Sequence, residues 1–466
     1  MPRNDVLMGA GALVLIIGAV LFFGSASRPF SCKDCNVIII AIDTFRADHA
    51  SALGYERETT PAFDALAKKG YLFSEAISPA SWTVPTFMSI FTGTYPSVHG
   101  VTNKFRVFTP SERVMSNLAE SAPELSTLAE VLSENGYATG GFTGDAGVSG
   151  AFGYKQGFDT YTDEVPFGGM ENSMRHALAW LDEHEDEKFF MFFHGYDLHG
   201  QFKIPPGYES IYDTGYDGTY RGTSAEEAVL REAQLAGPLA YTSEDAAFWT
   251  AWYDGKLHDA DARLAAFLDE IAKRNLMEDT VIVVLSDHGE EFFEHGGFDH
   301  GHSLYDEQLH VPLLFVIPGT DGGAVIDSQV STIDVMPTLL SLLDIRPTEE
   351  VRRQLAGRTN LLGYLENGER RGYDVFSETD YRDFTHKRSI RSEDGWKYIL
   401  TLENGTQELY DLSTDPGEQH NLFSAEPYRA RLLKDRLLAH LTETLGYDPS
   451  VPVSTGCLPV YPGECE

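Results

Sequence analysis

The sequence predicts an α/β protein, with a mostly parallel sheet flanked by helices and a smaller C-terminal α+β subdomain of antiparallel strands plus a helix. Two observations support this prediction. Short apolar runs alternate with helical patterns up to about residue 350, and beyond it polar and apolar residues alternate between turn signals such as NG and DPG. The length of 466 residues and the apolar fraction of 42% suit one large domain and a smaller one.

Residues 6–24 are the first predicted element, a membrane anchor. This stretch holds no charged residue over 19 positions, and a helix of that length spans about 28 Å, enough to cross the hydrocarbon core of a bilayer. The apolar core of a cleaved signal peptide is shorter, roughly 7 to 15 residues. We therefore expect residues 1–35 to be an anchor and linker that hold an extracytoplasmic protein at the membrane, or a signal that releases it if cleaved.

The four cysteines lie at the two ends of the chain. Cys32 and Cys35 follow the expected anchor, and Cys457 and Cys465 lie near the carboxyl terminus. An even number of cysteines in an exported chain predicts disulfides, with the pairing left open. A structural zinc site is the alternative, although the second spacing is too long for a usual zinc knuckle.

Four continuous apolar runs predict strands that are buried on both faces. Five or six successive β-branched or aromatic residues are typical of a parallel sheet between helices. Each run ends in a polar or charged cluster. The runs lie within residues 36–49, 188–200, 280–291 and 311–319.

Amphipathic patterns between these runs predict the covering helices, and two of the patterns end at glycine, which commonly terminates a helix. Residues 201–245 are rich in Gly, Tyr, Asp and Glu and predict a long irregular insertion that could shape a substrate pocket. The predicted helices lie within residues 60–70, 126–136, 170–185 and 254–274, with another near 427–445 in the C-terminal subdomain.

Polar side chains follow three of the predicted strands, at the point where each strand ends. In an open α/β sheet the ligand crevice lies beyond the carboxyl ends of the strands, so these residues would converge in space. Any one of them alone could be an ordinary turn residue. Three strand ends with the same ligand types indicate a metal site. The residues are Asp43, His194 with Asp197 and His199, and Asp287 with His288.

The stretch SWTVPTFMSIFTG, residues 81–93, predicts a short helix that begins beside Thr83. Pro85 is tolerated in the first turn of a helix because the amide it lacks would be unpaired there. Threonine at this position could simply be a cap. The unpaired amides and partial positive charge of a helix amino terminus also stabilise an anionic oxygen.

Together, Asp43, Thr83, Asp287 and His288 offer three oxygen donors and one imidazole nitrogen. A threonine hydroxyl is a poor nucleophile at neutral pH unless a base or a bound cation removes its proton. This mixed donor set suits Zn²⁺ or Mn²⁺ better than Ca²⁺, which prefers oxygen alone. We expect one such metal site.

Other polar residues are candidates near this site. His199 and His300 could hold the transferred group, protonate the leaving oxygen or contribute to a second metal site. The EHGGFDHGH stretch around His300 could instead be an exposed histidine-rich loop. Arg46 could brace Asp43 from behind, with an ordinary surface position as the alternative.

The charge of the chain excludes one class of partner. With 71 acidic and 35 basic residues the formal net charge is -36, which repels nucleic acid and favours solubility. We expect no nucleic-acid partner.

Several motifs resemble the sulfatase family of the alkaline phosphatase superfamily, over about residues 36 to 425. DTFRADHASALGYERETTPAFDALAKKG resembles the family's first metal strand and following helix, and SWTVPTFMSIFTGTYPSVHGV its nucleophile segment. LSDHGEEFFEHGGFDHGHSLYDEQLHVPLLF resembles the second metal segment, and ELYDLSTDPGEQHNL the carboxyl-terminal signature. The resemblance implies an alkaline-phosphatase-like fold, with a catalytic domain over residues 36–350 and a C-terminal subdomain over 351–466.

The departures from the family pattern indicate the chemistry. Sulfatases have Cys or Ser where this chain has Thr83, and oxidise that residue to formylglycine, which threonine cannot form. Phe87 replaces the arginine of that motif, and His288 stands where sulfatases often have asparagine. The lysine that precedes their tyrosine-acid pair has no counterpart before Tyr305, only histidines.

These changes resemble the threonine-nucleophile branch of the superfamily, which transfers phosphoryl groups. The resemblance implies that Thr83 attacks phosphorus in a phosphate mono- or diester, with Asp43, Asp287 and His288 holding the metal and His199 and His300 assisting. Residues Asp197 and His302 are candidates for a second metal or for supporting the ligands. One alternative is sulfate-ester hydrolysis without formylglycine, and another is a non-catalytic envelope protein that binds ligands on this scaffold.

Overall fold

The computed structural model describes residues 30–445, except 106–114, 201–202, 205, 213, 235–236, 368–371 and 383–384. The predicted anchor at residues 6–24 and the cysteines Cys457 and Cys465 lie outside the described residues. Within the described ranges, none of the helices has the length and apolar character that crossing a bilayer requires.

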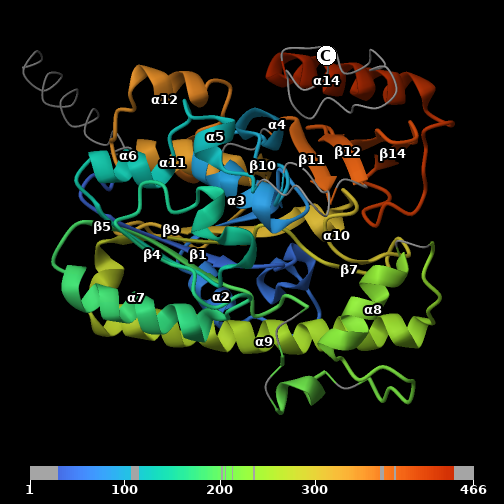
Figure 1. The fold of residues 1–466 in the computed structure, drawn as a ribbon, viewed down its shortest axis with the longest axis horizontal. Coiled ribbons are helices and arrows are strands. Elements are labelled where there is room, and N and C mark those ends of the chain that lie inside the picture. Colours follow the sequence, from blue (N-terminus) through green and yellow to red (C-terminus); the bar gives the residue numbers. More distant parts are fainter. Residues whose placement is uncertain are drawn as a thin grey trace, which may run out of the picture.

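An eight-stranded sheet forms the centre of the protein, as the sequence predicts, and most of its neighbouring strands are parallel (Figure 1). One predicted strand, β9, differs from this direction: it runs antiparallel to both of its neighbours, β6 and β2. In order across the sheet, the strands are β10 (Ala324–Ser331), β2 (Tyr71–Ile77), β9 (His310–Val316), β6 (Thr280–Leu285), β1 (Asn36–Ile42), β5 (Phe189–Gly195), β3 (Ala138–Phe142) and β4 (Thr160–Thr162).

Strand β1 shows why the apolar runs are continuous. All seven of its residues are buried, and successive side chains point to opposite faces of the sheet. Val37 and Ile39 belong to the hydrophobic core on one face, and Ile38 and Ile40 belong to the core on the other. A strand covered by helices on both sides has no polar face, so it shows no alternation in sequence.

Helices cover both faces of the sheet. In Figure 1, α3, α6 and α11 lie above it and α2, α7 and α9 lie below it. The helices are α2 (Pro61–Ala67), α3 (Thr83–Thr92), α4 (Pro96–His99), α5 (Leu118–Ser121), α6 (Leu128–Glu134), α7 (Met170–His184), α8 (Ser224–Gln234), α9 (Ser243–Lys273), α10 (Asp306–Leu309), α11 (Val335–Leu342), α12 (Glu349–Gln354), α13 (Leu362–Asn367) and α14 (Pro427–Leu445).

The C-terminal region contains the antiparallel sheet and helix that the sequence predicts. Strands β11 (Val375–Tyr381), β12 (Thr385–Arg391), β13 (Trp396–Thr401) and β14 (Gln407–Asp411) pair in sequence order. Apolar residues of α14, including Leu433 and Leu437, pack on Ile390 and Tyr398 of this sheet. Helices α12 and α13 instead contribute to a core of the large sheet.

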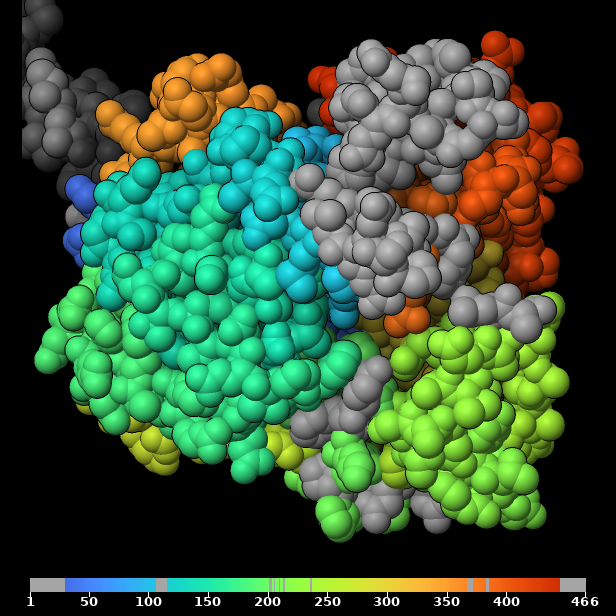
Figure 2. Space-filling model, in the orientation of Figure 1, coloured from blue at the N-terminus to red at the C-terminus, as the bar shows by residue number. Residues whose placement is uncertain are grey.

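The insertion at residues 201–245 is less irregular than its sequence suggests. It contains the helix α8, and the long helix α9 begins inside it, at Ser243. In Figure 2, the yellow-green surface of this region lies below the orange and red C-terminal strands.

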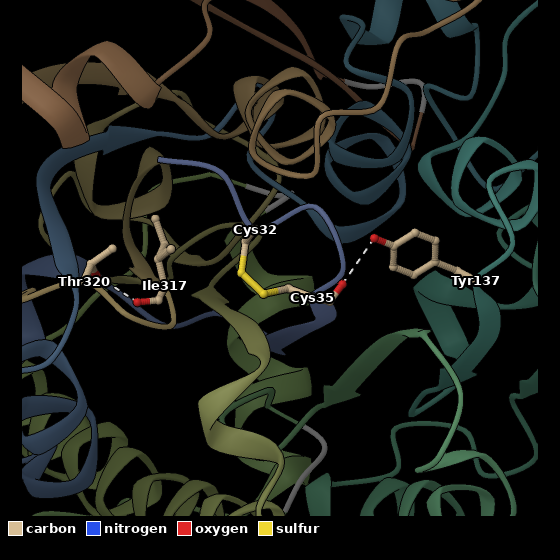
Figure 3. Close-up of a disulfide and its surroundings, with 5 residues drawn as sticks. All are labelled: Cys32, Cys35, Tyr137, Ile317 and Thr320. Atoms are coloured by element: carbon tan, nitrogen blue, oxygen red, sulfur yellow. Dashed lines mark hydrogen bonds between the residues drawn. A yellow bond between two sulfur atoms is a disulfide. The ribbon is translucent and has the colours of Figure 1, made fainter. Parts of the chain in front are cut away.

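A disulfide joins Cys32 and Cys35, which confirms the disulfide prediction for these two cysteines (Figure 3). The Cys32 backbone nitrogen donates to the Leu342 carbonyl at 2.8 Å. The Tyr137 hydroxyl donates to the Cys35 carbonyl at 3.2 Å. The loop before β1 is thereby tied to the end of α11 and to the segment that leads into β3.

Candidate active site

Three segments that are far apart in the sequence meet beyond the ends of β1 and β6. Asp43 follows β1, Asp287 and His288 follow β6, and Thr83 begins α3. The Thr83 hydroxyl lies 3.3 Å from Asp43 Oδ2 and 3.3 Å from His288 Nε2. All four side chains are buried. The structure therefore brings together the four residues that the sequence suggested as a metal set.

The donor atoms of this cluster could hold a cation. One carboxylate oxygen each of Asp43 and Asp287 and one ring nitrogen of His288 lie within 4.8 Å of one another. Among the described residues, Asp43 Oδ1 and Asp287 Oδ2 have no hydrogen-bond partner, although both atoms are buried. Burial and the neighbouring carboxylate of Asp287 raise the pKa of Asp43 well above its usual value. Two neighbouring buried carboxylates are stabilised either by a proton or by a compensating positive charge, which a divalent cation supplies.

His288 has the protonation state and orientation of a metal ligand. Its Nδ1 lies 2.8 Å from the Gly289 carbonyl, and because a carbonyl can only accept, the proton is on Nδ1. The lone pair of Nε2 then faces Thr83. Burial lowers the pKa of His288 to about 4, so the ring is neutral near pH 7.

Thr83 is the first residue of α3, and its hydroxyl does not act as a cap. Trp82 occupies the cap position, and no side-chain hydrogen bond caps the helix there. A Cβ atom added to Gly147 would lie 2.8 Å from Thr83 Cβ, so glycine permits the close approach of the Gly147 backbone to the Thr83 side chain. Phe87, where the resemblance to sulfatases implies an arginine, packs edge-on against the ring of His194 at a centroid distance of 5.2 Å.

The residue after Asp43 adopts a rare backbone conformation. Thr44 has a φ of 57°, which is unusual for a β-branched side chain and indicates local strain. Its amide donates to Asp287 Oδ1 at 3.3 Å, and its carbonyl accepts from Tyr253 at 2.7 Å. These bonds hold the turn that presents Asp43 beside Asp287.

His199 and His300 lie side by side next to this cluster. Their ring centroids are 5.0 Å apart, and His300 lies 4.3 Å from the ring of His288. Burial, followed by the charge of His300, lowers the pKa of His199 well below its usual value. Burial also lowers the pKa of His300, but the Glu290 carboxylate, 3.0 Å from its Nδ1, outweighs burial and raises it. The arrangement pairs a proton donor with a neutral acceptor.

Asp197, Arg46 and His302 contact groups outside the Thr83 cluster. Asp197 accepts from the Met170 amide at 2.7 Å at the start of α7 and lies 3.2 Å from Arg263. Arg46 donates to the Glu290 carbonyl at 2.7 Å and so supports the segment after β6 rather than the Asp43 side chain.

His302 lies 2.8 Å from Glu291. A second group of buried donors exists, but its members are Glu290, Asp299 and His300, without Asp197 or His302.

A cavity of about 230 Å³ lies in front of Thr83, His199 and His300. Sequence reasoning did not select the basic and aromatic residues of its wall, because only Tyr196 follows a predicted strand and its type is not that of a metal ligand. His194, which the sequence did suggest, lies close to the cluster: its Nε2 is 3.8 Å from Asp43 Oδ2. The additional wall residues include Trp82, Lys104, Tyr196, Arg231, Tyr381 and Arg382.

Comparison with known proteins identifies relatives along most of the chain. Residues 35–345 match the Sulfatase family model, and residues 293–444 match that of the N-sulphoglucosamine sulphohydrolase C-terminal region. Arylsulfatase K of Gallus gallus is 23% identical over 92% of this chain and 88% of its own length. The delta 4,5-hexuronate-2-O-sulfatase of Bacteroides thetaiotaomicron is 26% identical over 86% of this chain and 87% of its own length.

Solved structures show the same fold. The crystal structure of the phosphonate monoester hydrolase of Agrobacterium radiobacter superposes with a TM-score of 0.68. That superposition covers 88% of this chain and 96% of the hydrolase chain, at 22% sequence identity. The alkaline-phosphatase-like architecture expected from the sequence is thus confirmed.

Proposed function

Because this chain belongs to the sulfatase family, we propose that it is a metal-dependent hydrolase or transferase in which Thr83 attacks the phosphorus of a phosphate mono- or diester. One observation carries the proposal. The Thr83 hydroxyl faces Asp43 and His288 at 3.3 Å each, at the amino terminus of α3 and open to the cavity. A threonine that only capped the helix would direct its hydroxyl at the backbone amides of the first turn instead.

In the proposed reaction, the Thr83 hydroxyl loses its proton to solvent in the cavity, a bond forms between the Thr83 oxygen and phosphorus, and the bond between phosphorus and the leaving oxygen breaks. Asp43, Asp287 and His288 would hold the cation, together with the threonine oxygen. When bound, the cation lowers the pKa of the hydroxyl and neutralises charge on the phosphoryl group. Three oxygen donors and one imidazole suit Zn²⁺ or Mn²⁺ better than Ca²⁺.

The two histidines have different roles in the proposed reaction. His300, whose pKa is raised by Glu290, would donate a proton to the leaving oxygen. His199, kept neutral by burial, would accept a hydrogen bond from the substrate or from the incoming acceptor. The acceptor, which is water in a hydrolase and another hydroxyl in a transferase, then attacks phosphorus and gives its proton to the now neutral His300. The bond between phosphorus and the Thr83 oxygen breaks, and Thr83 takes up a proton from solvent.

Sulfate-ester hydrolysis is the second candidate, and the names of the relatives favour it. Both curated relatives described above are sulfatases. Against it stands Thr83 itself, because a sulfated threonine lacks the route by which an aldehyde hydrate eliminates sulfate. The non-catalytic alternative is disfavoured by the cost of burying Asp43 and Asp287 together in a protein that had no use for them.

We also propose that residues 6–24 anchor the protein to a membrane and place this site on the extracytoplasmic side. The uncharged stretch supports the anchor, and the disulfide between Cys32 and Cys35 is consistent with an oxidising compartment.

The test is turnover of matched aryl esters by the full-length protein in detergent. A phosphate monoester, a phosphodiester and a sulfate ester share one leaving group, and Thr83→Ala and Thr83→Ser are assayed beside the parent protein. We expect preference for a phosphorus ester, loss of turnover in Thr83→Ala and partial retention in Thr83→Ser. Preference for the sulfate ester would contradict phosphoryl transfer, and full activity of Thr83→Ala would contradict the nucleophile.

A further inference from the structure

Helix α8 of the insertion contacts the segment that carries His300. The Gln234 side-chain amide donates to the Phe298 carbonyl at 2.8 Å, and the Gln234 side-chain oxygen accepts from the Phe298 amide at 3.0 Å. Phe298 belongs to the short strand β8 (Phe298–Asp299). The glutamine therefore satisfies both backbone groups of Phe298, as a neighbouring strand would, two residues before His300.

Arg231, one turn earlier on α8, forms an ion pair with Asp299. The other oxygen of Asp299 accepts from the His300 amide at 2.9 Å and lies 2.8 Å from His300 Nδ1. Asp299 has a φ of 80°, a conformation that non-glycine residues rarely adopt. Contacts from α8 thus hold a strained residue that in turn orients the ring of His300.

Glu227, one turn further back, connects α8 to His199. Its carboxylate lies 3.1 Å from Lys256 of α9, and the side chains of this pair are only 6% and 4% exposed. Lys256 also donates to the backbone carbonyl of His199 at 3.4 Å. Because breaking a buried ion pair is costly, Glu227 fixes the lysine against the segment of His199.

Apolar packing explains little of this helix. Only Glu227 and Leu230 of its eleven residues are buried. Its polar contacts with the two histidine segments come from positions 227, 231 and 234, which share one face of a helix.

We propose that α8 positions His199 and His300 for the reaction, with Glu227, Arg231 and Gln234 as its positioning residues. The proposal rests on the role of the two histidines in the proposed function. The insertion then acts on the chemistry through the segments that carry His199 and His300. A misplacement of about 1 Å can cost a reaction on the order of 100-fold in rate.

Gln234→Ala in the full-length protein is the first test, because Gln234 does not line the cavity in front of Thr83. With a small aryl phosphate ester, kcat should fall by about 10- to 100-fold while KM changes by less than about twofold. Glu232→Gln is the matched control, since Glu232 is exposed on the same helix, and it should keep full activity.

Glu227→Gln tests the link to His199 and should also lower kcat. Arg231→Lys should retain more activity than Arg231→Gln, because it keeps the charge that faces Asp299. Unchanged kcat in Gln234→Ala and Glu227→Gln would overturn the proposal, as would a loss of activity that only follows a loss of folded protein.

Hydrogen exchange separates this proposal from the proposed function, since it needs no turnover. In Gln234→Ala, peptides that contain His300 should exchange faster than in the parent, with the core strand β1 unchanged. Unchanged exchange at residues 298–300 would overturn the positioning role even if Thr83→Ala were inactive. Faster exchange beside an active Thr83→Ala would contradict only the proposed function.

Discussion

Replacing Gly147 by alanine should displace the proposed nucleophile without unfolding the protein. Gly147 approaches Thr83 so closely that an added Cβ would lie 2.8 Å from both Cβ and Cγ2 of Thr83 and 2.9 Å from the Tyr196 hydroxyl. The backbone of Gly147 is not in the left-handed region, so alanine suits its conformation and the perturbation is the contact alone.

The size of the effect follows from the distances. Ordinary contacts to a Cβ begin at 3.4 Å, so Thr83 would have to shift by about 0.6 Å to relieve a contact of 2.8 Å. If a displacement of about 1 Å costs on the order of 100-fold, this shift costs roughly tenfold in kcat. Overpacking of this kind lowers the free energy of unfolding by about 1 to 3 kcal/mol.

The assay measures kcat and KM with an aryl phosphate ester and unfolding in urea, for Gly147→Ala and for a control. Gly417→Ala is the control, because the nearest atom to its added Cβ is Gln419 Cγ at 3.8 Å. The control should match the parent protein. Full activity of Gly147→Ala would refute the argument that the position of the Thr83 side chain determines the rate.

Three further predictions concern the metal and the charged groups. Removal of metal from the full-length protein with a chelator should lower its melting temperature and abolish turnover, and Zn²⁺ or Mn²⁺ should restore both. Asp287→Asn should remove the effect of added metal. A protein whose melting temperature and turnover do not respond to the chelator would contradict the cation site. Burial alone would raise the pKa of Asp380, but the paired guanidinium of Arg388 lowers it to about 2. Asp380→Asn should therefore lower the free energy of unfolding in urea by about 3 to 5 kcal/mol near pH 7. This difference should shrink as the pH falls from 3.8 toward 2, and a difference that stays constant would contradict the prediction. Burial opposes protonation of His295, but Glu307 raises its pKa to about 9. The stabilisation that His295→Gln removes should therefore be complete below pH 6.5 and vanish as the pH rises through 9. A difference between the two proteins in urea unfolding that persists at pH 10 would contradict the prediction.

The central strands and the four-residue cluster could be predicted from the sequence because their signals are local. An apolar run such as residues 36–42 marks a buried strand, and the polar residue after it marks the carboxyl end of the sheet. Asp43 and Asp287 follow parallel neighbours, β1 and β6, so their convergence follows from topology alone.

The direction of β9 could not be predicted in this way. A strand that is buried on both faces has the same composition whether it is parallel or antiparallel to its neighbours. Strand β3 was missed for a different reason. Its sequence, ATGGF, contains two glycines and resembles a turn, although most of the strand is buried. The glycines make room for Trp180 and Tyr161 on its two faces.

The rest of the site depends on side-chain partners that no spacing reveals. Asp197 follows a predicted strand, yet its carboxylate is directed to the amide of Met170. Arg231 lines the cavity from an insertion whose composition indicated no helix in particular. Which oxygen of a carboxylate faces a cavity is decided by tertiary packing, and a single sequence carries no record of it.

The most direct test of the central claim is to trap the covalent intermediate. The full-length protein, loaded with Zn²⁺ or Mn²⁺, is mixed with an aryl phosphate ester, quenched in acid and digested, and the peptide of residues 81–93 is analysed by mass spectrometry. We predict a phosphoryl group on Thr83 that is absent in Thr83→Ala and strongly reduced in Asp287→Asn. Turnover of the ester with an unmodified Thr83, or with the phosphoryl group on another residue, would contradict Thr83 as the nucleophile.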